Sequence, residues 1–323
     1  MPKRPRIPPK MTTALKTYER AATNVLQDFV TKIETTPPAP MIYHYTNDVG
    51  LKGIIESGKL WFSDIFGQND PSELRHGLAV AIRTLRSRIA DARPEIDTFA
   101  SMLERFDIDA GIEASAHYFI CCFSGDGDDL GQWRAYADNG RGYALGFETA
   151  PVENAFCRKK GKPIPQHHTF PITYDDAELT RIQTALVDLV DPLVSLPRKV
   201  SAKDDAINAY MSDLLVYHAM NVIRGVMFFK HQAYRNEKEF RFQQIFRRDK
   251  AAPAVKYRYR PHTLVRYREF DWRSAAAAAL KEIVIGPAAD KAKAERFVKD
   301  CLAAFNPKGA VKIVHSDIPY RAT

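Results

Sequence analysis

Residues 41–73, MIYHYTNDVGLKGIIESGKLWFSDIFGQNDPSE, decide the fold that this sequence predicts. Aromatic and β-branched side chains dominate residues 42–45, which favours a strand. Side chains alternate between the two faces of a strand, so His44 and Thr46 are expected on one face and the two tyrosines on the other. The stretch therefore places polar groups suited to chemistry on one side of a half-buried strand.

A helix and a second strand follow within the same stretch. Apolar residues at helical spacing predict the helix, and Thr46 or Asn47 is its expected N-cap. Gly58 stands where a left-handed C-cap is needed, and residues 60–62 resume as a strand. Residues 69–71, Asn-Asp-Pro, predict a turn before the next helix.

The rest of the chain alternates between amphipathic helices and short apolar strands, which predicts an α+β fold. The expected helices cover residues 11–34, 72–92, 94–106, 176–195, 204–226 and 289–305, and the expected strands cover residues 116–124, 142–148, 239–246, 257–267, 282–285 and 311–315. A basic tail with the N-terminal helix (1–40) is expected to precede a single α+β domain (41–323). A helical insertion at about 151–225 is expected to interrupt that domain.

The bulk composition is ordinary for a globular protein. Of the 323 residues, 45% are hydrophobic and 27% are charged, and no apolar run approaches the length of a membrane span. The four cysteines lack the spacing of a metal site or redox motif. The adjacent Cys121 and Cys122 lie in an apolar strand, so they are expected to be reduced core residues of a cytoplasmic protein.

The formal net charge of +8 favours anionic partners. Part of the excess lies in residues 247–268, RRDKAAPAVKYRYRPHTLVRYR, where tyrosines are interleaved with arginines. Arginine neutralises phosphates and tyrosine stacks on bases, so Arg258, Arg260 and Arg266 are candidates for binding nucleic acid. The alternative interpretation is a β-hairpin with a solvated basic face.

Two candidate residues stand on strands that carry or end in polar groups. His44, with Thr46 on the same face, is either a functional histidine or a hydrogen-bonded structural one. Ser124 ends an apolar strand that opens into the loop GDGDD, where the simplest role for a serine is to cap the turn.

An aromatic pair and an acidic pair complete the candidates. Trp133 and Tyr136 are three residues apart on an expected helical turn, so their rings lie on one face. Either they form the base of a pocket for a flat ring, or they pack in the core. Glu237 and Glu239 share a face if both lie on one strand, with Arg241 next in line. Because two carboxylates on one face repel, they indicate either a functional site or a solvated face with an ion pair to a neighbouring cation.

Missing motifs exclude several enzyme classes. The sequence contains no phosphate-binding or dinucleotide-binding glycine loop, no zinc-ligand spacing and no nucleophile elbow of a serine hydrolase. A phosphoester hydrolase that uses Asn69, Asp70, Glu73 and a metal ion stays open as a further alternative.

An ordered series of motifs runs through most of the chain outside the tail and the insertion. The motifs are YHYT, LKGIIESGKLWFS, NDPSE, CFS, QWRAYADNGRGYALGF, K-x3-Y-x2-E-x-E-x-R, EIVIGP and a closing S-D-I-P-Y-R. Together they resemble the bacterial family called domain of unknown function 2971 (DUF2971). That family name carries no function.

A more distant resemblance is to the ADP-ribosyltransferase fold, a mixed or antiparallel split sheet flanked by helices. It rests on a strand histidine followed by Thr, a helix ending in Gly, a central aromatic residue and a late strand glutamate. In the His-Tyr-Glu class of that fold, the histidine binds the nicotinamide-side ribose of NAD, an aromatic ring stacks on nicotinamide, and the glutamate anchors the ribose and steadies the oxocarbenium-like transition state. The resemblance implies these roles for His44, for Tyr136 or Tyr143, and for Glu239 or Glu237. The pair of glutamates two residues apart is also similar to the E-x-E motif of transferases in which the first acid helps to activate the acceptor. That similarity implies that Glu237 activates the acceptor and that Glu239 anchors the ribose.

The same resemblance implies NAD as substrate and no metal. The pyrophosphate needs cations, for which Arg134, Arg141 and Lys230 are candidates. The other candidate contacts to NAD are Thr46, Ser124, Trp133 and Arg241.

The implied reaction transfers ADP-ribose to a macromolecule, and the basic stretch slightly favours nucleic acid over protein as the acceptor. The implied biological role is a toxin or phage-defence effector with an antitoxin or other partner protein. The alternative function is a non-catalytic module that senses a nucleotide or binds nucleic acid.

Overall fold

The computed structural model describes residues 5–67, 72–88, 93–248, 251–305 and 310–321, except the side chains of residues 72–74. The chain forms two compact units, each drawn from alternating stretches of the sequence. The helical unit comprises Met1–Thr35, Asn69–Ser115 and Thr173–Gln232, and the sheet unit comprises Thr36–Gln68, Ala116–Ile172 and Ala233–Thr323. The sequence predicted one interrupted domain after a separate N-terminal segment, whereas the N-terminal helix shares a unit with the helices of the predicted insertion.

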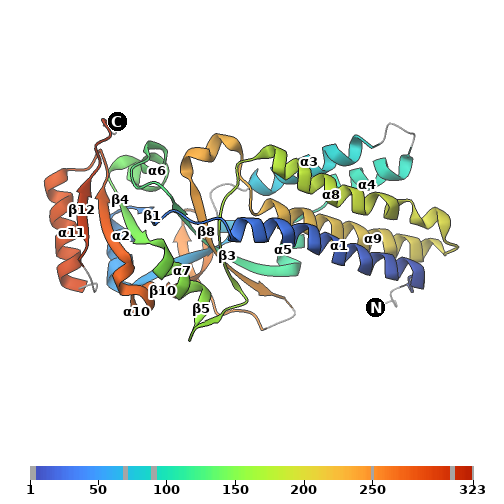
Figure 1. Cartoon of the computed structure of the whole chain (residues 1–323), viewed down its shortest axis with the longest axis horizontal. Helices are drawn as coiled ribbons and strands as arrows, with labels where there is room; N and C mark the ends of the chain where they lie inside the picture. Colours follow the sequence, from blue (N-terminus) through green and yellow to red (C-terminus); the bar gives the residue numbers. More distant parts are fainter. Residues whose placement is uncertain (1–4, 68–71, 89–92, 249–250, 306–309, 322–323) are drawn as a thin grey trace. The chain divides into compact units, whose positions relative to one another are not determined.

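The helical unit is built from helices that pack against one another (Figure 1). They are α1 (Pro9–Glu34), α3 (Ser72–Arg86), α4 (Pro94–Glu104), α5 (Ile108–Ser115), α8 (Asp176–Val194) and α9 (Asp204–Val226). On α1, apolar side chains recur every three or four residues, and the buried ones are Met11, Leu15, Tyr18, Ala22, Leu26, Phe29 and Ile33. The predicted N-terminal helix is confirmed, and it begins two residues earlier because a proline is well suited to the first turn.

The sheet unit holds the described sheets and the remaining helices (Figure 1). Its strands are β1 (Met41–Thr46), β2 (Lys59–Asp64), β3 (Ala116–Ser124), β4 (Tyr143–Glu148), β5 (Arg158–Lys159), β6 (Lys162–Pro163), β7 (His167–Pro171), β8 (Glu239–Arg247), β9 (Lys256–Arg260), β10 (Thr263–Asp271), β11 (Leu280–Ile285) and β12 (Lys312–His315). Its helices are α2 (Asp48–Ser57), α6 (Leu130–Tyr136), α7 (Thr149–Cys157), α10 (Trp272–Ala276) and α11 (Lys291–Phe305). The predicted α+β class with a mostly antiparallel sheet flanked by helices is confirmed.

The main sheet branches at β3. Strand β8 pairs with β3 along its whole length, from Ala116 to Ser124. On the other edge of β3, β2 pairs at Phe119 and Ile120 whereas β1 pairs at Ser124. One arm of the sheet then runs β1-β4-β11-β12 and the other runs β2-β10-β9, with β7 beyond β8. Within the described residues, the edge of β3 between these two pairings has no ladder partner.

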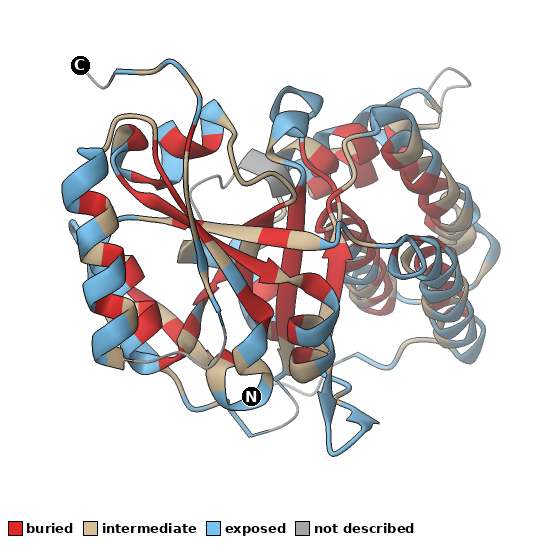
Figure 2. Ribbon diagram, turned by 60° about the vertical axis from the view of Figure 1, so that its left-hand side comes forward, coloured by how far each residue is buried: buried red, intermediate tan, exposed pale blue. Residues whose placement is uncertain are grey.

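The main apolar core covers one face of this sheet. Helices α2, α7, α10 and α11 contribute buried side chains to a cluster with alternate residues of β1, β3, β4 and β8. Figure 2 shows buried positions, in red, along the central strands and on the helices. A smaller cluster on the other face joins Tyr45 to Trp133 of α6. The predicted alternation along β1 is therefore confirmed, because Ile42 faces the main core and Tyr45 faces the smaller cluster.

Local chemistry at the ends of α2 agrees with the sequence. Asn47 is the N-cap, and its side chain accepts from the N–H of Gly50 at 2.9 Å, which decides between the two predicted caps. Gly58 has φ 66° at the C-cap, as predicted for a left-handed residue.

Strand β8 differs from the sequence expectation. Its sequence EFRFQQIF alternates polar with apolar residues, which is typical of a strand with one solvated face. In the structure residues 239–244 are buried on both faces, because β8 lies between β3 and β7. Polar side chains on such a central strand need partners inside the protein.

No helix within the described residues combines the length and apolar character that crossing a membrane requires.

Candidate functional site

One row of backbone pairs joins three strands that carry candidate residues. Tyr43 of β1 pairs with Ser124 of β3, and Ser124 pairs in turn with Glu239 of β8. Directly paired residues of antiparallel strands have their side chains on the same face, so these three share one face of the sheet. His44 is the next residue of β1 and follows on the opposite face.

His44 lies against the unpaired edge of β3. Its Nδ1 donates to the backbone carbonyl of Cys122 at 3.1 Å, and its ring packs edge-on against Phe123 with centroids 5.6 Å apart. A carbonyl oxygen only accepts, so Nδ1 carries the hydrogen and Nε2 of the neutral ring is the acceptor.

The pKa of His44 lies below its usual value. Burial favours the uncharged ring, the Cys122 carbonyl opposes this, and the positive charge of Arg258 lowers the pKa further. The ring is therefore neutral at pH 7. It serves as a hydrogen-bonded structural residue through Nδ1 and still offers a lone pair on Nε2.

Glu239 and Arg241 form a buried ion pair on β8. Arg241 donates through Nε to one carboxylate oxygen of Glu239 at 2.5 Å and through Nη2 to the other at 3.3 Å. The prediction that these two side chains share a face is confirmed. Cys122 is opposite Arg241 on β3, and burial together with the charge of Glu239 raises the pKa of its thiol well above the usual range. Its thiol is therefore protonated, and of the two adjacent cysteines Cys121 is the buried core residue whereas Cys122 is half-buried.

The predicted placement of Glu237 and Glu239 on one strand is wrong. β8 begins at Glu239, whereas Glu237 ends the short 3-10 helix η5 (Gln232–Glu237). Lys238 between them has φ 44°, and this left-handed residue ends the alternation that would put both carboxylates on one face.

Ser124 holds this junction in place. Its Oγ donates to the backbone carbonyl of Glu237 at 2.7 Å and accepts from the N–H of Asp126 at 3.1 Å. Ser124 therefore caps its own turn, as the simpler interpretation predicted, and also ties the start of β8 to the end of β3.

The two aromatic residues of α6 do not form one surface. Trp133 is fully buried, packs edge-on against Tyr45 with centroids 4.8 Å apart, and donates its Nε1 to Asp128 at 2.7 Å. Tyr136 is 38% exposed. The core interpretation is correct for Trp133, because its ring anchors the helix to β1, and only Tyr136 keeps the exposure that stacking on a ligand requires.

Tyr143 and Thr46 are paired neighbours on β4 and β1, and both side chains pack within the sheet unit. Tyr143 is 2% exposed, and burial together with its hydrogen bond to Asp48 raises its pKa. Thr46 Oγ1 lies 1.8 Å from where a Cβ on Gly50 would be, so it occupies the space beside the first turn of α2. Tyr143 is therefore a core residue, which leaves Tyr136 as the stacking candidate.

The three predicted pyrophosphate ligands are divided between the units. Arg134 of α6 and Arg141, which follows the 3-10 helix η3 (Asp138–Gly140), are exposed residues of the sheet unit. Lys230 belongs to the helical unit, where its backbone N–H donates to the carbonyl of Thr173 at 3.0 Å.

The basic stretch forms the predicted hairpin, with β9 and β10 joined at residues 261–262. Two of its candidate arginines are held by groups of the sheet unit. Arg260 Nη1 donates to the carbonyl of Gly67 at 2.6 Å, and Arg266 Nη2 lies 3.0 Å from Oδ2 of the buried Asp64. The expected solvated row of arginines is therefore wrong at these two positions, because the register turns them toward partners.

Arg258 differs from the other two. Its Nη2 donates to Ser63 Oγ at 2.7 Å, its side chain is half-buried, and its charge is close enough to His44 to lower the histidine pKa. The sequence singled out this residue for nucleic acid, whereas the fold brings it near the branch of the sheet.

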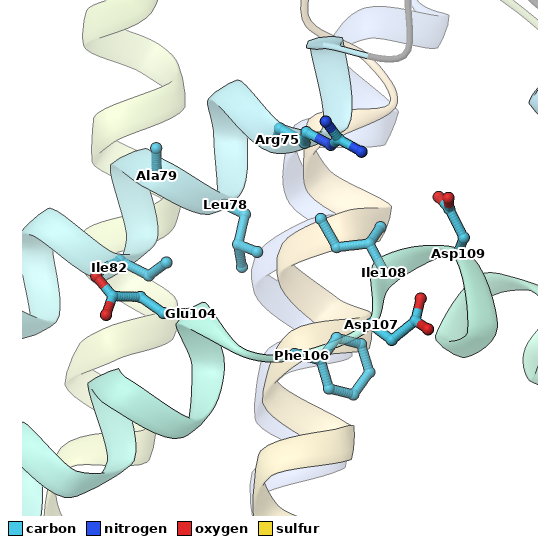
Figure 3. Close-up of a pocket in the computed structure, with 9 residues that line it drawn as sticks. All are labelled: Arg75, Leu78, Ala79, Ile82, Glu104, Phe106, Asp107, Ile108 and Asp109. Atoms are coloured by element: carbon cyan, nitrogen blue, oxygen red, sulfur yellow. The ribbon is translucent and has the colours of Figure 1, made fainter.

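The helical unit has a separate surface pocket of about 340 Å³ that contains none of the predicted site residues. Leu78 and Ile82 of α3 and Phe106 contribute apolar side chains to it, with Glu104 at the end near Ile82 and Asp109 at the other end (Figure 3). The alternative hydrolase site lies outside the described residues, because these do not include Asn69, Asp70 or the side chain of Glu73.

Sequence reasoning missed three residues around the branch. Tyr43 donates its hydroxyl to Glu282 at 2.7 Å on the face of Ser124, Trp61 is 44% exposed on β2, and Asp128 receives the indole of Trp133. In the strand KLWFSD, alternation puts the tryptophan on the face opposite Leu60 and Phe62, and this alternation was the available signal for Trp61. The other two depend on contacts distant in sequence.

Residues 132–242 match the model of a family described as protein of unknown function (DUF2971). The match supports the DUF2971 family for this chain. The matched DUF2971 segment includes Glu239 and Arg241 and ends before the basic hairpin; His44 and Ser124 precede it. No curated protein and no solved structure matches the chain significantly.

Proposed function

We propose that the chain is an NAD-dependent ADP-ribosyltransferase-like enzyme that cleaves the nicotinamide–ribose bond. The observation that carries this proposal is the row of Tyr43, Ser124 and Glu239 across three adjacent strands, with the ring of His44 against the unpaired edge of β3 next to that row. The sequence resemblance assigns this chemistry to a strand histidine and a late strand glutamate. Here those two residues belong to the strands that pair with β3 at Ser124, one on each edge.

The proposed reaction breaks the bond between ribose C1′ and the nicotinamide nitrogen, and the bonding electrons leave with neutral nicotinamide. Positive charge then develops on the sugar. A preorganised carboxylate stabilises such a charge most effectively where water is excluded, and Glu239 is a buried carboxylate. A nucleophilic atom of the acceptor bonds to C1′ and releases its proton; if water is the acceptor, the product is free ADP-ribose.

Two contacts support Glu239 as a positioned group. Arg241 holds both of its carboxylate oxygens, and Ser124 ties the segment just before it to the end of β3. Positioning of this kind lowers the entropy lost in reaching the transition state.

The tautomer of His44 also fits the proposal. A hydroxyl of the nicotinamide-side ribose is a hydrogen-bond donor, and Nε2 of a neutral ring with Nδ1 bound to the Cys122 carbonyl is an acceptor. For an acceptor macromolecule, the internal contacts of Arg260 and Arg266 remove part of the reason for preferring nucleic acid, so protein and nucleic acid are tested together.

The test is release of free nicotinamide from NAD by the purified chain, alone and with protein lysate, RNA or DNA. We expect Glu239→Gln and His44→Asn to lower release by about 100-fold or more, since the first removes the carboxylate assigned to the transition state and the second the acceptor assigned to the ribose. Glu148→Gln is the matched control, because it makes the same change at an exposed ion pair with Lys281 in the same unit.

If Glu239→Gln releases nicotinamide as fast as wild type, the proposal is wrong. If the wild-type chain binds ADP-ribose and releases no nicotinamide with any acceptor, the nucleotide-sensing alternative replaces it.

A further inference from the structure

The arm β2-β10-β9 presents an aromatic and cationic group on the face that carries Ser124. Ser63 of β2 pairs with Ile120 of β3 and with Tyr267 of β10, so all three share a face. Ile120 and Ser124 are four residues apart on β3 and share that face too. Trp61 is two residues before Ser63, and Arg258 reaches Ser63 from β9, so both lie on this face.

Within the part of the chain that the structure describes, no carboxylate pairs with the guanidinium of Arg258. Its Nη2 donates to Ser63, whereas its Nε is buried and has no hydrogen-bond partner among the described residues. It also makes no ion pair with a described carboxylate, in contrast to Arg266, which pairs with Asp64. Burial and the nearby charge of Arg260 lower the pKa of Arg258. A half-buried cation with an unused donor is a group that an anion would stabilise.

Trp61 offers a fixed aromatic surface on the same face as this cation. Its ring is 44% exposed, yet it rests on the buried Tyr267 with centroids 4.4 Å apart and planes inclined by 31°. An indole held by a second ring has lost much of its freedom before any ligand binds, which favours stacking by a flat base. Tyr267 also links the two groups, because it contacts Trp61 and acts electrostatically on Arg258.

This arm and the strand of His44 are neighbours on the same edge of β3. The positive charge of Arg258 also lowers the pKa of His44, which independently indicates that the two side chains are near each other. His44 contacts the unpaired edge of β3 between the two arms, so a ligand that enters this gap would meet His44 on one side and the face of Trp61 and Arg258 on the other.

We propose that Trp61 and Arg258 form a nucleotide-recognition subsite, in which Trp61 stacks on the base and Arg258 binds the adjoining phosphate. The assignment of this subsite to the adenosine half of NAD rests on the proposed function, whereas the binding of a nucleoside phosphate does not. The subsite replaces the surface nucleic-acid role that the sequence gave to Arg258.

The test is titration with ADP and with adenosine, followed by tryptophan fluorescence and calorimetry. The other two tryptophans, Trp133 and Trp272, are fully buried, so quenching by a stacked base reports on Trp61. We expect Trp61→Ala to weaken ADP and adenosine alike by about 10-fold or more. We expect Arg258→Gln to weaken ADP by about 10-fold or more and adenosine little, because only ADP carries the phosphate.

Two matched controls separate these effects from general damage. Tyr259→Ala removes a ring that is 77% exposed and lies on the other face of the same hairpin, and Lys281→Gln removes an exposed cation on β11. Neither is expected to change ADP binding. Arg258→Lys keeps the charge and serves in place of Arg258→Gln if that variant melts at a lower temperature than wild type; partial retention of the ADP preference is then the expected result.

Failure of ADP to bind wild type, or an equal effect of Arg258→Gln on ADP and adenosine, would overturn the subsite. Tighter competition by a single-stranded oligonucleotide than by ADP at equal nucleotide concentration would also overturn it in favour of nucleic acid. ADP binding without nicotinamide release would keep the subsite and reject the proposed function, and the reverse pattern would reject the subsite alone.

Discussion

Arg241 donates to both carboxylate oxygens of Glu239, and their side chains are only 8% and 6% exposed. Removing two charges from water is unfavourable, and their mutual attraction offsets this only while both are present. Each side chain therefore stabilises the charge of the other inside the protein. The pair explains how a central strand tolerates a glutamate and an arginine on one face.

The first prediction follows from this dependence. Arg241→Leu removes the cation that holds both carboxylate oxygens of the buried Glu239, so the free energy of unfolding should fall by up to about 3–5 kcal/mol. The double variant Glu239→Leu with Arg241→Leu removes both charges and should recover most of that loss. Urea unfolding of the single and double variants measures both values.

The control is Lys281→Ala, which breaks an ion pair with Glu148 whose members are 45% and 47% exposed. We expect a change below about 1 kcal/mol there. A loss of that small size in Arg241→Leu would show that the buried pair contributes no more than a surface one.

The second prediction concerns two glycines of the same helix. A Cβ on Gly50 would lie 1.8 Å from Thr46 Oγ1, whereas a Cβ on Gly53 would meet nothing within 4 Å. Gly50→Ala should therefore destabilise the sheet unit by about 1–3 kcal/mol. Gly53→Ala should stabilise it by up to about 1 kcal/mol, because alanine loses less backbone entropy in a helix.

Thermal unfolding of the two alanine variants gives the comparison directly. Adding Thr46→Ala to Gly50→Ala removes the clashing hydroxyl and should restore most of the stability. Equal effects of the two glycine substitutions would contradict the close packing of Thr46 against α2.

The elements of this fold were predictable where local chemistry decides them. Asn47 caps α2 through a neighbour three residues away, and Gly58 ends it with a positive φ. Residues that act over one helical turn leave their signal in the sequence. The grouping of α1 with α8 and α9 left no such signal, because it depends on packing between segments more than a hundred residues apart.

The candidate site was predictable only in part, for a related reason. Glu239 and Arg241 share a face because alternation along a strand is fixed. Glu237 was misplaced because one left-handed residue, Lys238, ends that alternation. Likewise, sequence spacing treats Arg258 and Arg266 alike, whereas only the strand register gives Arg266 a buried aspartate as its partner.

The third prediction is a pH dependence in the helical unit. His218 is fully buried on α9, its Nδ1 contacts the hydroxyl of Tyr18 at 2.9 Å, and its Nε2 has no partner among the described residues. Burial lowers the pKa of His218 from 6.5 to about 3. Below pH 6.5 the unfolded chain binds a proton that the folded chain does not, so stability is lost as pH falls from about 6.5 toward 3.

The loss should approach about 1.4 kcal/mol for each pH unit within that range. His218→Gln keeps a hydrogen-bonding partner for Tyr18 and removes the titration, so its stability should fall less between about pH 6.5 and pH 5. Urea unfolding at several pH values measures the slopes, and His262→Asn at the exposed hairpin turn is the control. Some slope should remain in His218→Gln, since burial also lowers the pKa of His44 and His167. Parallel curves for wild type and His218→Gln would contradict the prediction.

The fourth prediction concerns the segment after β12, which Asp128 holds to the loop before α6. Asp128 accepts from Trp133 Nε1 at 2.7 Å, from Ser316 Oγ at 2.5 Å and from the N–H of Asp317 at 3.3 Å. Three donors converge on one carboxylate, and the indole among them is fully buried. Asp128→Ala leaves that buried donor unpaired, which should cost about 1–3 kcal/mol of stability.

Loss of this carboxylate should also release the C-terminal segment. Hydrogen exchange at the amide of Asp317 should accelerate in Asp128→Ala, because the amide loses its acceptor. Asp128→Asn keeps one acceptor oxygen for Trp133 and Ser316 and replaces the other with a donor, so it should retain more stability while still accelerating exchange at Asp317. Asp290→Ala, which removes an exposed carboxylate paired with Lys293, is the control and should leave that amide unchanged. If exchange at Asp317 is the same in Asp128→Ala as in wild type, the carboxylate does not hold the segment, and the positions of Trp133 and α6 must depend on packing against Tyr45 instead.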